Sequence, residues 1–291
     1  MRLADCARGS ITLADGGWGT EFERLGARFG ECIDAWNLTK PEMVRRVANS
    51  YIEAGSRVIL TNTFRANPLS LRESGFEDDG DAINRAGVKI SREAAGKAAL
   101  VFASMGPSGR SLVNGEVARK ELQEAFSQQA QALASEGPDA ILVETMADLE
   151  EARIAAAAAL ETGLPVLVSL FFIRAAGATE PASQATPEQA AATLTRDGVQ
   201  GIGANCGSGV REFISLCKRL AAASPLPIWI KPSAGLPEIV DGQARYPVTP
   251  SEFARSGQDL AGAGATFLGG CCGTTPEFIR ALGQQRAFRK P

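Results

Sequence analysis

Short runs of apolar and β-branched residues alternate along the whole chain with longer stretches rich in Ala, Leu, Glu and Arg. The longer stretches, such as PEMVRRVANSYIEAG from Pro41 and RKELQEAFSQQAQALASEG from Arg119, carry apolar residues at helical spacing and close on glycine. Strands that alternate with amphipathic helices predict a parallel sheet. The predicted strands begin near Ile11, Arg57, Ala99, Ala140, Pro165, Gly201, Pro227 and Ala265.

Eight such strand–helix units within 291 residues predict a closed (β/α)₈ barrel, an α/β fold that forms a single domain over residues 1–291. An open doubly wound sheet is the alternative, but no G-x-G-x-x-G follows the first strand. No sequence repeat of fixed period is present.

A barrel of this kind places its active-site residues at the carboxyl ends of the strands and in the loops that follow them. Strands six and eight both end in cysteine, and they stand two places apart around a ring of eight. Cys206 is therefore expected to face Cys271 and Cys272 across the rim. The strand ends read Asp15-Gly16-Gly17, Thr61-Asn62-Thr63-Phe64, Gly106-Pro107, Glu144-Thr145, Asn205-Cys206 and Cys271-Cys272.

Composition narrows the chemistry. The chain contains six cysteines and no histidine, so imidazole bases, histidine-ligated metals and Ser-His or Cys-His nucleophile pairs are excluded. A net charge of −3 without a basic tract argues against nucleic-acid binding. The longest apolar runs are about half a membrane span, and the amino-terminal residues show no apolar signal core, so we expect a cytoplasmic protein without a membrane partner.

Three cysteines that converge on one rim suit a tetrahedral zinc site in which the fourth position stays open. Thiolates favour zinc over hard cations. Three thiolates and Zn²⁺ sum to a charge of about −1, so the centre would activate water poorly but would keep a fourth, substrate thiolate nucleophilic. This predicts alkylation of a substrate thiol. Cys6, Cys32 and Cys217 are expected to be ordinary thiols, with Cys217 packed against the barrel.

The segments ADGGWGTEFERLG, EAGSRVILTNTFRAN, GPSG, ILVETMADLEEA, GANCG and GGCCGTTPEFI resemble the homocysteine S-methyltransferase family, in order and over nearly the whole chain. That family includes betaine– and S-methylmethionine–homocysteine methyltransferases and the homocysteine-binding module of cobalamin-dependent methionine synthase. The resemblance implies a barrel whose zinc is held by Cys206, Cys271 and Cys272, with the homocysteine sulfur as a further ligand. It also implies that Asp15, Gly16 and Glu144 bind the amino-acid end of homocysteine, with Glu144 facing the ammonium group, and that Asn205 supports or transiently ligates the metal.

The methyl donor is less determined. Animal-type betaine enzymes have tyrosines where this chain has Arg65 and Thr145, which argues against a closed aromatic cage for betaine. Trp36 and Phe64 are candidates to face a cationic methyl group, with core packing as the alternative for both. Arg65 is expected to point into the barrel mouth and to pair with the carboxylate of a zwitterionic donor. With no cobalamin or folate domain in this sequence, the donor would be a small onium compound or a separate corrinoid protein.

We therefore predict a zinc-dependent methyltransferase that converts homocysteine to methionine. Methyl transfer from a separate corrinoid protein is a second hypothesis for the enzymatic activity. A non-enzymatic zinc-thiolate redox sensor is the rival from another class. Asp15 and Glu144 separate the two classes, because a sensor has no need of an amino-acid pocket.

Overall fold

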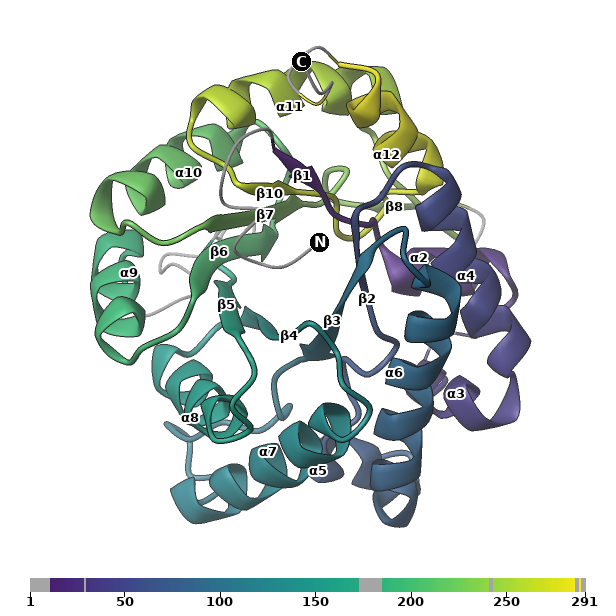
Figure 1. The fold of residues 1–291 in the computed structure, drawn as a ribbon, viewed down its shortest axis with the longest axis vertical. Coiled ribbons are helices and arrows are strands. Elements are labelled where there is room, and N and C mark those ends of the chain that lie inside the picture. Colours follow the sequence, from purple (N-terminus) through teal and green to yellow (C-terminus); the bar gives the residue numbers. More distant parts are fainter. Residues whose placement is uncertain (1–10, 29, 173–184, 241–242, 286–287, 289–291) are drawn as a thin grey trace.

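The computed structural model describes residues 11–28, 30–172, 185–240, 243–285 and 288. Within these ranges, eight parallel strands form one sheet that curls into a ring, with helices packed around its outside (Figure 1). Each of the eight strands lies in one of the runs that the sequence pattern predicts. The strands are β1 (Thr12–Leu13), β2 (Val58–Leu60), β3 (Leu100–Met105), β4 (Ala140–Met146), β5 (Val166–Leu170), β6 (Gly201–Cys206), β7 (Ile228–Pro232) and β10 (Phe267–Leu268).

The ring closes between its first and second strands. The hydrogen-bonded order is β1-β10-β7-β6-β5-β4-β3-β2. A parallel bridge between Ala14 and Val58 joins the two ends, and the Arg57 N–H donates to the Leu13 carbonyl at 2.8 Å. This closure confirms the predicted (β/α)₈ barrel and excludes the open sheet.

The outer layer consists of helices whose apolar faces cover the sheet. Several begin at side-chain caps that are visible in the sequence: Thr186 and Thr249 each form a capping box with a glutamine or glutamate three residues later. The helices are α2 (Trp18–Arg24), α3 (Trp36–Thr39), α4 (Pro41–Glu53), α5 (Pro68–Arg72), α6 (Gly80–Ala95), α7 (Arg119–Ala134), α8 (Leu149–Leu160), α9 (Pro187–Arg196), α10 (Glu212–Ala223), α11 (Pro250–Gly262) and α12 (Pro276–Gly283), with 3₁₀ turns at Ile33–Ala35 and Glu77–Asp79.

Inside the ring, the two-residue period of the strands stacks side chains in layers. Phe102, Trp229 and Phe267 form an aromatic layer with ring centroids 5.5 to 5.8 Å apart. Two residues further along β3 and β7 come Ser104 and Lys231, which therefore stand one layer nearer the carboxyl ends of the strands. A layer of polar side chains therefore lies next to the aromatic layer, on the side of the carboxyl ends of the strands.

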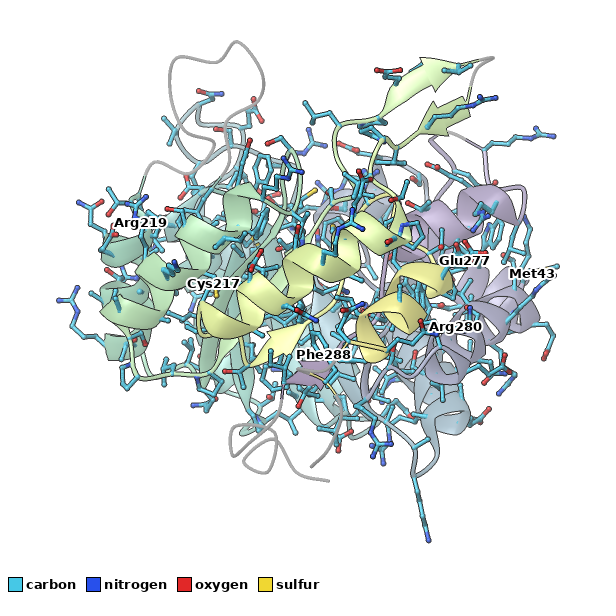
Figure 2. All side chains as sticks on the ribbon, turned by 90° about the horizontal axis from the view of Figure 1, so that it is seen from above. Met43, Cys217, Arg219, Glu277, Arg280 and Phe288 are labelled. Atoms are coloured by element: carbon cyan, nitrogen blue, oxygen red, sulfur yellow. The ribbon has the colours of Figure 1, made fainter. Side chains whose placement is uncertain are left out.

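A two-stranded antiparallel hairpin between β7 and α11 lies outside the sequence prediction. Its strands are β8 (Glu238–Val240) and β9 (Gln243–Arg245), and it projects from the body of the barrel (Figure 2). The Asp-Gly pair between two short runs is a hairpin signal that the sequence offers, although residues 241–242 themselves are not among those described.

Candidate functional site

The carboxyl ends of β6 and β10 bring three thiols together. The Cys206 and Cys272 sulfurs are 3.8 Å apart, those of Cys271 and Cys272 are 3.9 Å apart, and all three sulfurs lie within 4.8 Å of one another. We call Cys206, Cys271 and Cys272 the trithiol cluster. The cluster has the spacing of a group that can hold a metal ion.

Strand β7 holds the cluster together because it lies between β6 and β10. Beyond its end, the Ser233 N–H donates to the Cys206 carbonyl and the Ala234 N–H to the Cys272 carbonyl, at 3.0 and 2.9 Å. The Cys271 N–H in turn donates to the Pro232 carbonyl at 2.9 Å. One continuous backbone segment thus sets the distance between Cys206 and Cys272, which are 66 residues apart in sequence.

Backbone strain is concentrated here. Cys206 has φ 70° and Thr145 has φ 61°, and these are the non-glycine residues with positive φ among those described. Such conformations cost on the order of 1–3 kcal/mol each and persist where the surrounding structure requires them. Cys206 is the last residue of β6 and Thr145 the last but one of β4, and both line the same cavity, so the backbone strain lies at the candidate site.

The thiols cannot all ionise on their own. Hydrogen bonds from Cys271 and Cys272 lower the pKa of Cys206, while the neighbouring Cys206 thiolate raises the pKa of both Cys271 and Cys272. A bound cation would remove this mutual repulsion and allow all three to act as thiolates.

Asn205 connects the trithiol cluster to the strained end of β4. Its Oδ1 accepts from the Thr145 N–H at 3.0 Å and from the Ser169 hydroxyl at 2.6 Å. Its Nδ2 donates to the Thr145 hydroxyl at 2.6 Å and lies 3.9 Å from the Cys271 sulfur. With its oxygen engaged twice, this amide is placed to position Cys271 and Thr145 rather than to approach a metal through oxygen.

Asp15, Lys231 and Glu144 are three buried ionisable residues at the carboxyl ends of the barrel strands, and we call them the charged triad. The Lys231 ammonium is 2.5 Å from Asp15 Oδ1, and the two side chains are 3% and 0% exposed. Asp15 Oδ2 accepts from the Trp18 indole N–H at 2.6 Å and from the Leu60 N–H at 2.7 Å. The Asp15 carboxylate is therefore fully engaged inside the protein.

Glu144 is the less satisfied carboxyl group of the triad. It is buried, and its Oε1 accepts from the Ser104 hydroxyl at 2.5 Å. Burial raises its pKa to about 7, although the nearby Lys231 charge and the Ser104 hydrogen bond lower it. Burial alone would lower the Lys231 pKa, but the charges of Asp15 and Glu144 more than offset that, and the pKa of Lys231 is raised.

A cavity of about 340 Å³ opens above the triad and contains the trithiol cluster on its wall. Of the residues that the sequence singled out, Gly16, Phe64, Glu144, Thr145 and the three cysteines line it, whereas Asp15, Asn205, Trp36 and Arg65 do not. The lining is completed by Gly17, Trp18, Gly19, Thr20, Ile33, Leu60, Thr61, Asn62, Ser104 and Lys231. We call this the mouth cavity.

Trp36 and Arg65 lie away from the expected donor site. Trp36 is 2% exposed, packs edge-on against Phe22 and donates its indole N–H to Glu31, while the Lys40 ammonium covers its ring at 3.8 Å. Arg65 is on the surface with its guanidinium 3.2 Å from Glu73. Trp36 thus follows the core-packing alternative, and the expectation that Arg65 points into the mouth does not hold in this structure.

Lys231 and Ser104 are site residues that the sequence reasoning missed. Both stand on the inward face of a strand, two residues beyond the aromatic residues Trp229 and Phe102. A lysine at the end of the apolar run PIWIK was the available signal, because an unpaired charge there would be costly to bury.

Two further thiols stand apart from the cluster. Cys217 is buried on α10 against α11, where its sulfur is 3.6 Å from the Ala263 carbonyl (Figure 2), which confirms the expected packing role. Cys32 is half-buried beside the 3₁₀ turn at Ile33–Ala35 and outside the mouth cavity, and Cys6 lies outside the described residues.

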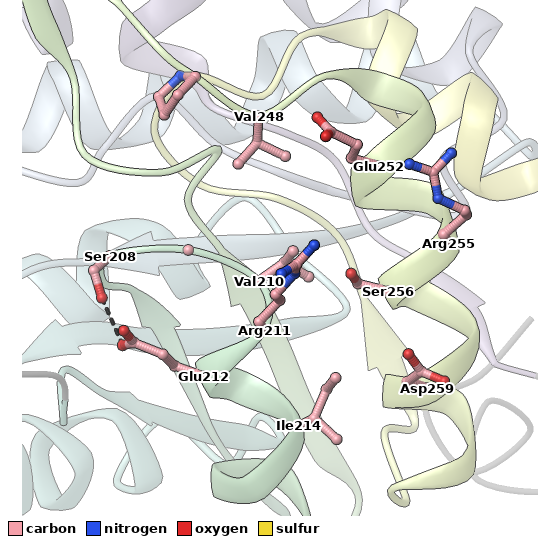
Figure 3. A pocket seen from close by; sticks show the side chains of 12 residues that line it. Ser208, Val210, Arg211, Glu212, Ile214, Val248, Glu252, Arg255, Ser256 and Asp259 are labelled. Atoms are coloured by element: carbon pink, nitrogen blue, oxygen red, sulfur yellow. Dashed lines mark hydrogen bonds between the residues drawn. The ribbon is translucent and has the colours of Figure 1, made fainter.

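A larger groove of about 660 Å³ runs between the start of α10 and α11 (Figure 3). It shares no lining residue with the mouth cavity, and its charged side chains are exposed and of both signs: Arg211, Glu212, Glu252, Arg255 and Asp259. The groove therefore lacks the convergent buried groups that mark the mouth cavity as the functional site.

Fold and site together define a (β/α)₈ barrel protein that has three converging thiols, able to hold a metal ion, and a cavity with buried ionisable groups at the carboxyl ends of its strands. The chain matches the family model of homocysteine S-methyltransferase over residues 12–286 and belongs to that family. Among the described residues, no helix is long and apolar enough to span a membrane.

The chain is similar in sequence to methionine synthases, and a solved structure shares its fold. The chain is 29% identical to methionine synthase of Mycobacterium leprae and 28% identical to that of Mycobacterium tuberculosis, matching 94% and 96% of its own length. It spans about a quarter of the length of those relatives, 24% and 25% respectively. The structure of the homocysteine methyltransferase MmuM from Escherichia coli in its metallated form shares the fold, with a TM-score of 0.79 at 24% identity, covering 96% of this chain and 98% of that one.

Proposed function

We propose that this protein transfers a methyl group to the thiol of homocysteine and yields methionine, with a zinc ion held by the trithiol cluster. The observation that carries the proposal is the presence of three converging thiols and one buried, incompletely paired carboxyl group in a single cavity of about 340 Å³. A thiol-containing amino acid has one group for each of these features.

The thiol spacing fits zinc. Zn–S bonds of about 2.3 Å at tetrahedral angles place sulfurs about 3.8 Å apart. The observed separations of 3.8 and 3.9 Å agree with this value. A bound zinc ion would lower the pKa of the homocysteine thiol and hold it as a thiolate nucleophile.

The protein's own residues supply orientation. Glu144, on the inner wall, would accept the substrate ammonium as a charge-assisted hydrogen-bond partner. Asn205 and Ser169 fix the end of β4, so Thr145 and Glu144 keep their positions when substrate enters. Because Gly16 lacks a side chain, the backbone after β1 can pass close to Thr274 and leave the cavity open. This fixed arrangement, rather than acid–base chemistry, is the protein's contribution to rate.

The donor would approach over an apolar wall. The mouth cavity is lined in part by Trp18, Ile33 and Phe64. The aromatic rings of Trp18 and Phe64 would suit contact with the methyl group of a small onium compound. Arg65 is paired with Glu73 and plays no part in this proposal. Delivery of the methyl group by a corrinoid protein is the second candidate, favoured by the similarity to much longer methionine synthases.

The test measures metal and product in the same preparations. We expect one zinc ion per chain in the purified protein and loss of zinc in Cys206→Ser, Cys271→Ser and Cys272→Ser. Cys217→Ser is the matched control, because a hydroxyl can replace the buried thiol as a donor to the Ala263 carbonyl.

Zinc-loaded protein should then form methionine from homocysteine with at least one of betaine, S-methylmethionine and methylcobalamin. Zinc retention in all three cluster variants would refute the metal site. Failure to bind homocysteine at all would refute the substrate, and would leave the redox-sensor alternative as the better description.

A further inference from the structure

Asn62, in the segment that follows β2, carries one polar atom that the rest of the protein leaves free. Its side chain is buried, at 4% exposure, and lines the mouth cavity. Its Nδ2 donates to the Ile33 carbonyl at 2.7 Å and to Asn37 Oδ1 at 3.0 Å. Both N–H groups of the amide are therefore used, and Oδ1 is the side-chain polar atom that remains.

The orientation of this amide is fixed by its neighbour Asn37. Asn37 Nδ2 donates to two backbone carbonyls, that of Asn62 at 2.7 Å and that of Ile83 at 3.0 Å. Because carbonyl oxygens only accept, the Asn37 nitrogen must face them and the Asn37 oxygen must face the Asn62 side chain. The Asn62 amide must then turn its nitrogen toward Asn37 and Ile33, because its oxygen in that place would meet two other acceptors.

Packing holds Asn37 in this position. The residue is 3% exposed, and a methyl group at Gly87 of α6 would stand 2.6 Å from its Nδ2, so that helix lies directly against the amide. Buried polar groups that are paired with one another in this way specify a single arrangement. The direction of Asn62 Oδ1 is therefore set by the fold before a ligand binds.

Asn62 Oδ1 is open to the mouth cavity. It accepts no hydrogen bond from the described residues, and the fully enclosed side-chain atoms without a partner in this part of the chain are Gln129 Oε1 and Trp229 Nε1. Since Asn62 lines the cavity, its free oxygen is exposed there. The other uncharged polar side chains of the lining each make a hydrogen bond within the protein through the hydroxyl group: Thr20, Thr61, Ser104 and Thr145.

We infer that Asn62 Oδ1 binds an ammonium group of a ligand in the mouth cavity. An amide oxygen only accepts, so it recognises an N–H or O–H group, and a positively charged donor gives the stronger hydrogen bond. The inference rests on the proposed function, because both ligands of that reaction can carry the ammonium group. One source is homocysteine, and the other is a methyl donor that is itself a sulfonium amino acid.

A fixed acceptor of this kind makes Asn62 a specificity-determining residue. A ligand with an amino group pairs with Oδ1, whereas a ligand of the same shape without that group covers the oxygen and leaves it unpaired. The loss of water from an unpaired acceptor costs free energy, so the second ligand is penalised as well as unrewarded. Asn62 should therefore discriminate between an amino acid and its des-amino analogue.

The experiment is calorimetric titration of zinc-loaded wild type and Asn62→Ala with two matched pairs of ligands. L-homocysteine is paired with 4-mercaptobutyrate, and S-methylmethionine with 4-(dimethylsulfonio)butyrate, so that the members of each pair differ only in the amino group. We expect Asn62→Ala to bind the amino-acid member of at least one pair roughly ten- to a hundredfold more weakly, the loss of one charged hydrogen bond. Its des-amino partner should bind as tightly as before or more tightly, and the pair that responds identifies the source of the ammonium group.

Asn84→Ala is the matched control. Asn84 is 1% exposed, its Nδ2 also donates to two backbone carbonyls, those of Ala66 at 2.8 Å and Gly80 at 2.7 Å, and it does not line the mouth cavity. This variant should leave the preference for the amino-acid member unchanged in both pairs. Where Asn62→Ala does not fold, Asn62→Ser is the second variant, because its shorter side chain keeps one donor and loses the amide oxygen.

Other results would overturn the inference. Equal weakening of both members of a pair would show that Asn62 supports the cavity wall without contacting the ammonium group. A similar loss of preference in Asn84→Ala would assign the effect to the buried amide network in general. Should the wild-type protein bind none of the four ligands, the proposed function fails; should it bind them while the Asn62 variant keeps the wild-type preference, the inference alone fails.

Discussion

Replacement of Glu144 by glutamine should raise the free energy of unfolding at alkaline pH relative to its effect at acid pH, although it removes the group that we propose binds the substrate ammonium. Glu144 is 7% exposed, and burial raises its pKa from 4.5 to about 7. The folded protein therefore binds more protons than the unfolded chain between these two values. Its free energy of unfolding then falls as pH rises through this window, because deprotonation is easier in the unfolded state.

The size of the effect follows from the two pKa values. With 4.5 for the unfolded and about 7 for the folded state, linkage gives a cost of about 0.8 kcal/mol at pH 5 and about 3.3 kcal/mol at pH 8. A glutamine cannot ionise, so Glu144→Gln lacks this pH-dependent cost. The difference in unfolding free energy, variant minus wild type, should therefore grow by about 2.5 kcal/mol from pH 5 to pH 8.

The assay is urea unfolding of metal-free, reduced protein at several pH values, followed by circular dichroism. The pH-dependent part of the difference is the quantity of interest, because any fixed cost of the buried amide is the same at every pH. Glu124→Gln removes an exposed carboxylate from α7 and controls for the loss of one charge. A pH-independent difference between Glu144→Gln and wild type would refute the reasoning that burial of this carboxyl group destabilises the empty site.

Two further predictions concern single side chains. Arg65→Ala should leave the kinetic constants unchanged with every accepted donor and change stability by at most about 1 kcal/mol, because the guanidinium pairs with Glu73 on the surface; a selective loss with carboxylated donors would instead place it in the donor site. Gly16→Ala should lower the free energy of unfolding by about 1–3 kcal/mol in a urea titration, because its methyl group would stand 2.6 Å from the Thr274 carbonyl and 2.7 Å from the Tyr51 ring. Gly19→Ala, whose methyl group meets nothing within 4 Å, is the matched control, and equal losses in both variants would contradict the steric explanation.

The strained residues and the charged triad both lower the stability of the unliganded protein at the candidate functional site. Cys206 and Thr145 adopt positive φ, and Glu144 is buried without a cationic partner of its own. Each feature costs free energy in the unliganded protein, and the proposed binding of a metal ion and an amino acid would offset that cost. Ligand binding at such a site is expected to raise the protein's free energy of unfolding more than binding at a pocket whose polar groups are already paired.

Local sequence pattern was sufficient to predict the fold and the position of the trithiol cluster. The two-residue period of the strands and the helical period between them are properties of short segments, so all eight strands could be predicted without tertiary information. The barrel rule then assigns Cys206, Cys271 and Cys272 to one rim, since the carboxyl ends of parallel strands share an edge.

Only the closed tertiary structure shows which groups the side chains at that rim contact. Asp15 and Lys231 are 216 positions apart in sequence and meet because ring closure brings the first and seventh strands to the same interior layer. The Arg65 guanidinium pairs with Glu73, and the Trp36 indole N–H donates to Glu31. The spacing of apolar residues along the chain predicts neither pairing. Pairing of buried charges depends on distances between strands that are remote in the chain, and for that reason the role of each rim residue required the tertiary structure.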